Sequence, residues 1–256
     1  MKLFFREYGA QHEEAIVILH GLFGMGDNWT AIAKQLSEQY RVIVPDLRNH
    51  GQSPHAEAMD LQAMSEDLFE LLCALHLERI ILLGHSMGGK VAMTFTLHHP
   101  EGVRKLCVAD IAPRAYPTSD LHQLVVQLLK QIDPIKEGSR KAIEERLTQG
   151  GLDYGVTQLL MKNLYWKDDA LSWRFNIEAL ANHLPEIGTE VISSSAYLGE
   201  TLFLRGALSK YIGVDDERAI QGLFPKAQIE TIADAGHWLH AERPKEFLQA
   251  FLAFIE

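Results

Sequence analysis

Residues 79–100 read R-I-I-L-L-G-H-S-M-G-G-K-V-A-M-T-F-T-L-H-H-P, and this stretch decides the fold. Its apolar start is typical of a buried strand, and the run that begins at Lys90 has helical character. Between them, Gly84-His85-Ser86-Met87-Gly88 fits the G-x-S-x-G pattern, which places a nucleophilic serine on a sharp strand-to-helix turn. The stretch therefore predicts an α/β fold with Ser86 projecting from the end of a strand, although a serine that merely caps a helix would look similar.

Strands and helices alternate outward from this turn in both directions. Two early helical patterns, 29–40 and 61–75, and a terminal one at 244–255 separate or follow the apolar runs. Such alternation predicts a mostly parallel, doubly wound sheet covered by helices. Besides the run before Ser86, the expected buried strands are residues 15–20, 41–46, 106–111, 201–206 and 227–232.

The alternation stops between Pro113 and about Glu200. This segment contains amphipathic helical patterns at 121–132, 141–147 and 156–164 and no convincing buried strand. An unstructured loop of that length is improbable in a compact domain. We therefore expect a helical cap over 114–199, inserted into an α/β core made of 1–113 and 200–256.

Composition excludes several classes of protein. The chain has 256 residues, 47% of them hydrophobic and 23% charged, as in ordinary globular proteins. A formal charge of −10 disfavours nucleic-acid partners, and no apolar stretch approaches the roughly 20 residues of a membrane span. The start lacks the apolar core of a secretory signal, and Cys73 and Cys107 lie in apolar surroundings. We expect two buried, reduced thiols, a cytoplasmic location and no membrane span.

A serine hydroxyl needs a base that accepts its proton. In an α/β sheet with a G-x-S-x-G turn, the histidine is expected last, after the final strand. His237, in the stretch Ala233-Asp234-Ala235-Gly236-His237, has that position and is the predicted base. His240 follows three residues later, and we expect it to support the site from the surface or from behind the base.

The acid that orients the histidine is less simply placed. It usually follows the strand predicted at 201–206, but no carboxylate occurs there before Asp215 and Asp216. Asp110 closes the strand after the serine helix, 24 residues beyond Ser86 and at the same edge of the sheet. Because a triad is defined by geometry and roles, we favour Asp110 and keep Asp215 and Asp216 as alternatives.

Negative charge on a tetrahedral intermediate requires backbone donors. The loop His20-Gly21-Leu22-Phe23-Gly24 follows the first buried strand. The N–H groups of Leu22 and Met87 are the predicted oxyanion hole. The polar stretch 46–53 is expected to build a turn near the site.

The stretches HGLFG, DLRNHGQS, GHSMGG, KLCVADIAP and GHWLHAERP together resemble the α/β-hydrolase superfamily. Within it, DIAP and the stretch Trp173 to Asn176 resemble the small YbfF-like bacterial esterases and thioesterases. The resemblance implies Ser86 as nucleophile, Asp110 as acid and His237 as base. It also implies acyl esters and acyl-CoA thioesters as substrates.

The sequence thus predicts a cofactor-free and metal-free serine esterase or thioesterase that acts on short to medium acyl chains. Its partner is a small-molecule acyl substrate, and the sequence leaves the oligomeric state open. The alternatives are a C–C bond hydrolase or a haloperoxidase on the same fold, or a binding protein without turnover. The predicted substrate-binding residues are Phe23, Leu121, Leu124, Leu160, Trp166 and Phe175.

Overall fold

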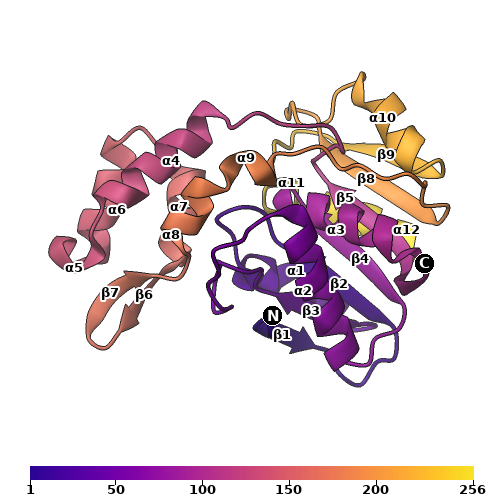
Figure 1. The fold of residues 1–256 in the computed structure, drawn as a ribbon, viewed down its shortest axis with the longest axis horizontal. Helices are drawn as coiled ribbons and strands as arrows, with labels where there is room; N and C mark the ends of the chain where they lie inside the picture. Colours follow the sequence, from indigo (N-terminus) through magenta and orange to yellow (C-terminus); the bar gives the residue numbers. More distant parts are fainter.

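The computed structural model describes residues 1–256 and contains a seven-stranded sheet with a helical insertion at one end (Figure 1). The strand order is β1-β3-β2-β4-β5-β8-β9, with β1 antiparallel to β3 and every other pair parallel. The mostly parallel, doubly wound sheet is therefore confirmed. The strands are β1 (Phe5–Tyr8), β2 (Ala15–Leu19), β3 (Arg41–Pro45), β4 (Ile80–His85), β5 (Val103–Ala109), β8 (Glu200–Gly206) and β9 (Ala227–Ile232).

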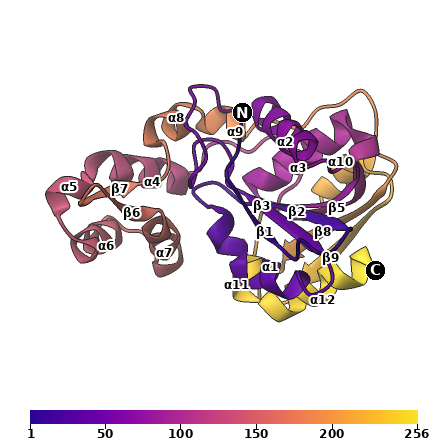
Figure 2. The same cartoon turned by 90° about the horizontal axis from the view of Figure 1, so that it is seen from below.

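Helices cover both faces of the sheet, which is why its central strands β2 and β4 are apolar and buried throughout (Figure 2). One hydrophobic cluster joins one sheet face to α2, α3 and α10, and a second cluster joins the other face to α1, α11 and α12. The bounds are α1 (Thr30–Leu36), α2 (Leu61–Ala74), α3 (Met87–His98), α10 (Asp216–Leu223), α11 (Leu239–Glu242) and α12 (Pro244–Ile255). Two 3-10 helices span Gly26–Trp29 and Pro100–Gly102.

The two edges of the sheet depart from the sequence prediction. β1 was not expected, because its residues, FREY, carry charges and the strand has no fully buried position. β9 was expected to be buried on both faces, but only Ile232 of the strand is buried. The prediction was wrong there because β9 is an edge strand, with β8 as its one neighbour.

The insertion between β5 and β8 consists of helices and one hairpin, and it extends away from the sheet (Figure 1). Side-chain caps begin its main helices: Ser119 accepts from His122 N at the start of α4, and Asp153 accepts from Val156 N at the start of α7. The hairpin β6–β7 was not predicted from the sequence. The elements are α4 (Asp120–Gln131), α5 (Pro134–Glu137), α6 (Arg140–Gln149), α7 (Tyr154–Lys162), β6 (Leu164–Lys167), β7 (Ala170–Trp173), α8 (Ile177–Asn182) and α9 (Leu184–Ile187).

The two linkers that join this insertion to the core lie side by side. Tyr116 N donates to Gly188 O at 2.8 Å, and Val191 N donates to Pro113 O at 2.8 Å. The buried Lys90 side chain donates from α3 to carbonyl oxygens of both linkers, those of Arg114 and Thr189. The base of the insertion is therefore closed by hydrogen bonds. Whether 114–199 acts as a cap stays a prediction.

Both cysteines are free thiols. Cys107 is buried in β5, as expected, but Cys73 is exposed on α2, where the prediction of a buried thiol was wrong. Leu71 and Leu72 before it are buried, whereas Cys73 itself lies on the exposed side of the helix. None of the helices combines the length and the apolar character that crossing a bilayer requires.

Candidate active site

Ser86 lies on a turn that only small neighbours allow. Its backbone φ is +53°, in a region that side chains rarely adopt, directly between β4 and α3. A Cβ atom on Gly84 would lie 2.3 Å from Gly88 O, and one on Gly88 would lie 2.5 Å from Leu19 O. Both glycines are therefore needed for the close approach of β4, α3 and the end of β2 that exposes Ser86 at the sheet edge.

His237 reaches Ser86 from the loop between β9 and α11. Its Nε2 lies 3.0 Å from Ser86 Oγ, which is hydrogen-bond distance. The ring of Tyr211 stacks on the imidazole, with the ring centroids 4.0 Å apart. His85 Nε2 donates to the His237 carbonyl oxygen at 2.8 Å, so His85 anchors the loop that carries His237. The predicted base thus has the position that proton transfer from Ser86 requires.

Asp110 is the carboxylate that the structure brings to His237. Its Oδ2 lies 2.7 Å from His237 Nδ1, and the side chain is fully buried. Gly206 N donates to Oδ1 at 3.0 Å, and the Ser209 hydroxyl donates to Oδ2. The backbone φ of Asp110 is +54°. Three donors therefore surround this carboxylate at the end of β5, the strand beside the one that carries Ser86.

The alternative acids lie elsewhere. Asp216 accepts from Gly213 N and forms an ion pair with Arg114 at 2.8 Å, at the start of α10. Asp215 does not contact the site, and of the three candidate acids Asp110 alone contacts His237. Ser209 was missed in the sequence, although it occupies the turn after β8 in which this fold more often carries its acid. A polar residue in that turn was the available signal.

His240 contributes packing behind the base. Its ring stacks on Trp29 with centroids 4.1 Å apart, and the residue is buried. Burial, followed by the proximity of His237, lowers the pKa of His240 to about 3. The neutral ring thus fills the space between α11 and the 3-10 helix that ends at Trp29.

Two unused amide donors lie beside the nucleophile. A Cβ atom on Gly21 would lie 3.3 Å from Ser86 Cβ, so the loop 20–24 runs next to the serine. Neither Leu22 N–H nor Met87 N–H donates a hydrogen bond to another protein atom. Free N–H groups on both sides of a serine are what a developing oxyanion requires. No group of histidine, cysteine, aspartate and glutamate side chains here is arranged to hold a metal ion.

Two buried histidines support the loop 20–24 from below. His20 Nδ1 donates to Gly21 O at 2.9 Å, and its Nε2 accepts from Leu47 N at 2.9 Å. His50 Nδ1 donates to Arg48 O at 3.0 Å, and its Nε2 accepts from Phe23 N at 3.2 Å. Burial lowers the pKa of His20 to about 4. Burial and the proximity of His20 lower that of His50 to about 3. Both rings are therefore neutral at pH 7, each with its proton on Nδ1.

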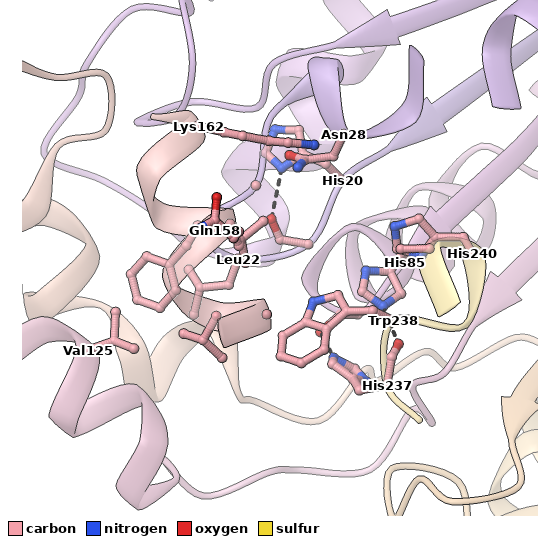
Figure 3. Close-up of a pocket in the computed structure, with 18 of the residues that line it drawn as sticks. His20, Leu22, Asn28, His85, Val125, Gln158, Lys162, His237, Trp238 and His240 are labelled. Carbon is pink, nitrogen blue, oxygen red and sulfur yellow. Dashed lines mark hydrogen bonds between the residues drawn. The ribbon is translucent and has the colours of Figure 1, made fainter. Parts of the chain in front are cut away.

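Two cavities open on either side of Ser86, which lines both together with Leu22 and His122. The larger, of about 470 Å³, includes His237 and Trp238 from the loop after β9, and Gln158 and Lys162 from α7 (Figure 3). The smaller, of about 270 Å³, lies between α3 and the cap linkers. Its walls include Met87, Lys90, Ile111, Tyr116, Leu184 and Ile187.

The predicted substrate-binding residues fall into two groups. Phe23 and Leu121 line the larger cavity. The other four line neither cavity beside Ser86. Leu160 and Phe175 are buried in the core of the insertion, Leu124 packs against that core, and Trp166 is 61% exposed on β6. Helical spacing indicates an apolar face but not which neighbour that face meets, so core residues and cavity residues look alike in the sequence.

Comparison with known proteins agrees with this geometry. The profile of the α/β hydrolase fold family matches residues 14–244. The chain is 39% identical over 247 residues to the sn-1-specific diacylglycerol lipase ABHD11 of Danio rerio, covering 94% of this chain and 78% of the lipase. It is 34% identical to esterase YbfF of Escherichia coli, covering 100% and 99% of the two chains. A solved marine microorganism esterase is 42% identical, with a TM-score of 0.96 over 99% of both chains.

Proposed function

The chain belongs to the α/β hydrolase family and is a serine ester hydrolase, and we propose that its reaction runs through an acyl-enzyme formed on Ser86. The resemblance to this family and to YbfF-like esterases that the sequence predicted is thereby confirmed. The observation that carries the proposal is the chain of contacts Ser86 Oγ, His237 Nε2, His237 Nδ1 and Asp110 Oδ2, at 3.0 and 2.7 Å.

In the acylation half of the proposed reaction, His237 Nε2 accepts the proton of Ser86 as Oγ attacks the carbonyl carbon of the ester. The carbonyl oxygen becomes an oxyanion that accepts hydrogen bonds from Leu22 N–H and Met87 N–H. Asp110 holds the imidazole with Nδ1 protonated and stabilises the imidazolium that forms. His237 then donates its proton to the leaving oxygen, the carbon–oxygen bond breaks and an alcohol departs.

In the deacylation half, a water molecule takes the place of the alcohol. His237 accepts a proton from this water, whose oxygen attacks the acyl carbon. The second oxyanion accepts hydrogen bonds from the same two N–H groups. When this intermediate collapses, the bond between the acyl carbon and Ser86 Oγ breaks and His237 returns the proton to Oγ. The products are a carboxylic acid and a regenerated serine.

The position of His237 supports a proposed role for each of the two cavities. Because His237 must donate a proton to the leaving oxygen, the alcohol portion belongs in the larger cavity, which His237 lines. The acyl chain then extends into the smaller cavity, whose walls include Met87, Ile111, Leu184 and Ile187. Its limited size favours short to medium acyl chains. Acyl-CoA thioesters are proposed substrates of the same mechanism, and a cytoplasmic location stays a prediction.

The test is hydrolysis of p-nitrophenyl butyrate by the parent and by Ser86→Ala. We expect kcat to fall on the order of 10⁴-fold or more, since the members of a triad act as a unit. A fluorophosphonate probe should label the parent and not the variant. Equal turnover of the two proteins would rule out Ser86 as nucleophile. A series of acyl-CoAs of increasing chain length, run beside the p-nitrophenyl esters, tests the thioesters.

A further inference from the structure

The oxyanion loop, residues 20–24, is held by the inserted cap as well as by the core. Phe23 is buried and has a backbone φ of +60°. Its N–H donates to His50 Nε2 in the core at 3.2 Å. Its carbonyl oxygen accepts from Asn163 Nδ2, 140 residues away in the sequence, at 2.8 Å and out of contact with solvent. Two side chains from separate parts of the fold thus engage both backbone groups of one strained residue.

Asn163 is built for this contact at the end of α7. The residue is fully buried, and its Nδ2 lies between two carbonyl oxygens, that of Phe23 and that of Leu159 at 3.2 Å. Facing two acceptors fixes the amide with the nitrogen toward the loop. Its Oδ1 is buried without a partner, and such an unsatisfied acceptor costs about 1–3 kcal/mol. The buried amide thus bridges the end of α7 and the oxyanion loop.

The hydrogen bond from Asn163 to Phe23 affects the orientation of the Leu22 N–H group through the planar peptide units between them. Gly21 O accepts from His20 Nδ1 at 2.9 Å and from Gly24 N at 3.0 Å. Because a peptide unit is planar, these bonds fix the direction of the Leu22 N–H on the same unit. The Gly24 bond exists only while Phe23 keeps its left-handed conformation, which costs roughly 1–2 kcal/mol for a residue with a side chain. Asn163 and His50 hold Phe23 in that conformation.

The ring of Phe23 is also held by the cap. It packs edge-on against Phe175, with centroids 6.1 Å apart, and against His122 of α4 at 6.4 Å. The backbone and the side chain of Phe23 therefore both depend on the docked cap. Displacing the whole insertion would remove the bond from Asn163 and the packing of His122 and Phe175 on the ring.

We propose that Asn163 is a positioning residue through which the docked cap assembles the oxyanion hole. The cap then has a part in stabilising the transition state, in addition to shaping the cavities. The inference rests on the proposed ester hydrolysis through Ser86. It assigns to Asn163 no contact with substrate, because its whole effect passes through Phe23 to Leu22 N–H.

The experiment compares Asn163→Ser with the parent and with Asn176→Ser as a matched control. A serine at 163 can still bond Leu159 O within its own helix but is too short to reach Phe23 O. Asn176 Nδ2 also joins the insertion to the core, through Asn49 Oδ1 at 3.2 Å, and it forms no hydrogen bond with residues 20–24. A serine there keeps the N-cap of α8. Each protein is assayed with p-nitrophenyl butyrate and with an aryl trifluoromethyl ketone, whose serine adduct carries an oxyanion.

For Asn163→Ser we expect kcat to fall about 10- to 100-fold, less than the loss of an oxyanion donor itself. The inhibition constant of the ketone should rise by the same factor while KM stays within about twofold, because only transition-state binding is lost. Asn176→Ser should match the parent in both. If Asn163→Ser loses thermal stability but keeps kcat and ketone affinity, Asn163 is structural only and the proposal is overturned.

A second variant covers poor folding of the first. Asn163→Leu keeps the branching and the number of side-chain heavy atoms, removes Oδ1 together with the donor, and should show the same paired loss of kcat and ketone affinity. A normal kcat in folded Asn163→Leu would contradict the proposal. Failure of the proposed function is distinct, since it would appear as a parent whose activity does not depend on Ser86.

Discussion

The turn that carries Ser86 and the wall of the cavities are built in opposite ways. At the turn, an added methyl group on Gly88 would lie 2.5 Å from Leu19 O, so the backbone itself fills the space. In the wall, Leu121 of α4 lines the larger cavity and is 39% exposed. The difference teaches that the position of Ser86 depends on close backbone approach, whereas the cavity wall depends in part on helix side chains that a substitution can change without moving the backbone.

We expect the largest effect from a substitution that disrupts the proposed triad and leaves the cavity wall unchanged. Asp110→Asn keeps the size of the side chain but holds His237 in the wrong tautomer, so kcat should fall on the order of 10⁴-fold. Asp216→Asn, which loses an ion pair with Arg114 instead, should stay within about threefold of the parent. Steady-state kinetics with p-nitrophenyl butyrate measures both. A large fall in kcat for Asp216→Asn and none for Asp110→Asn would show that Asp216 of α10, and not Asp110, is the triad acid.

Alanine substitutions at two glycines, one in the Ser86 turn and one in the insertion, compare the stability cost of an added methyl group in the two regions. Gly88→Ala would force α3 away from β2, and we expect it to cost at least about 3 kcal/mol of stability, in the upper range for point substitutions. Gly138→Ala in the cap meets no atom within 4 Å but has a φ of +69°, so we expect a cost of about 1 kcal/mol. Urea denaturation measures both. Equal costs would show that the turn has more room than its geometry indicates.

The core should also be the region that acid weakens, because burial lowers the pKa of His20 to about 4 and that of His50 to about 3. Unfolded histidines bind protons below about pH 6.5, whereas these folded ones stay neutral. Stability is therefore full above pH 6.5 and is lost as the pH falls toward 4. For each of the two histidines, we expect the free energy of unfolding to fall by about 2 kcal/mol between pH 6.5 and pH 5.

Urea denaturation across this pH range measures the loss, which should be shallower in His50→Gln. His98→Gln, at an exposed position, is the matched control and should reproduce the parent profile. A parent stability that does not change between pH 7 and pH 5 would contradict the burial of neutral histidines beneath the loop.

We expect the smallest effect from a substitution that changes only the cavity wall. Ile187→Phe enlarges a side chain of the smaller cavity, so kcat/KM should fall about tenfold for the octanoate ester relative to the butyrate ester. Trp166→Ala removes an exposed ring that lines neither cavity, and it should leave this ratio unchanged. If Leu121→Phe, in the larger cavity, altered the acyl ratio instead, the two cavities would have the reverse assignment.

Much of the core could be predicted from the sequence because its signals are local. The runs that became β2, β3 and β4 are apolar at nearly every position, and the glycines around Ser86 mark the turn. The order of Ser86, Asp110 and His237 along the chain follows from the sheet topology, since all three follow strand ends at one edge. The hypothesis that placed Asp110 beside His237 rested on that shared edge.

The remaining residues depend on contacts that no local pattern encodes. Ser209 bonds a carboxylate 99 residues away, and Asn163 bonds a carbonyl 140 residues away. A polar residue in the turn after β8 was the one signal for Ser209, and the sequence around Asn163 does not differ from an ordinary helix end. The edge strands were mispredicted for a related reason, because whether a strand such as β9 has a second neighbour is decided by the whole sheet.

The paired linkers at the base of the cap have a consequence for how the protein could be re-engineered. The chain leaves the core at Pro113 and returns at Val191 with these two residues hydrogen-bonded to each other. Any segment whose ends meet in the same way could be grafted there without moving β5 or β8. Such a transplant would retain the triad and exchange the substrate range. It would work only if the grafted segment supplied an N–H group to the carbonyl oxygen of Phe23, as Asn163 does here.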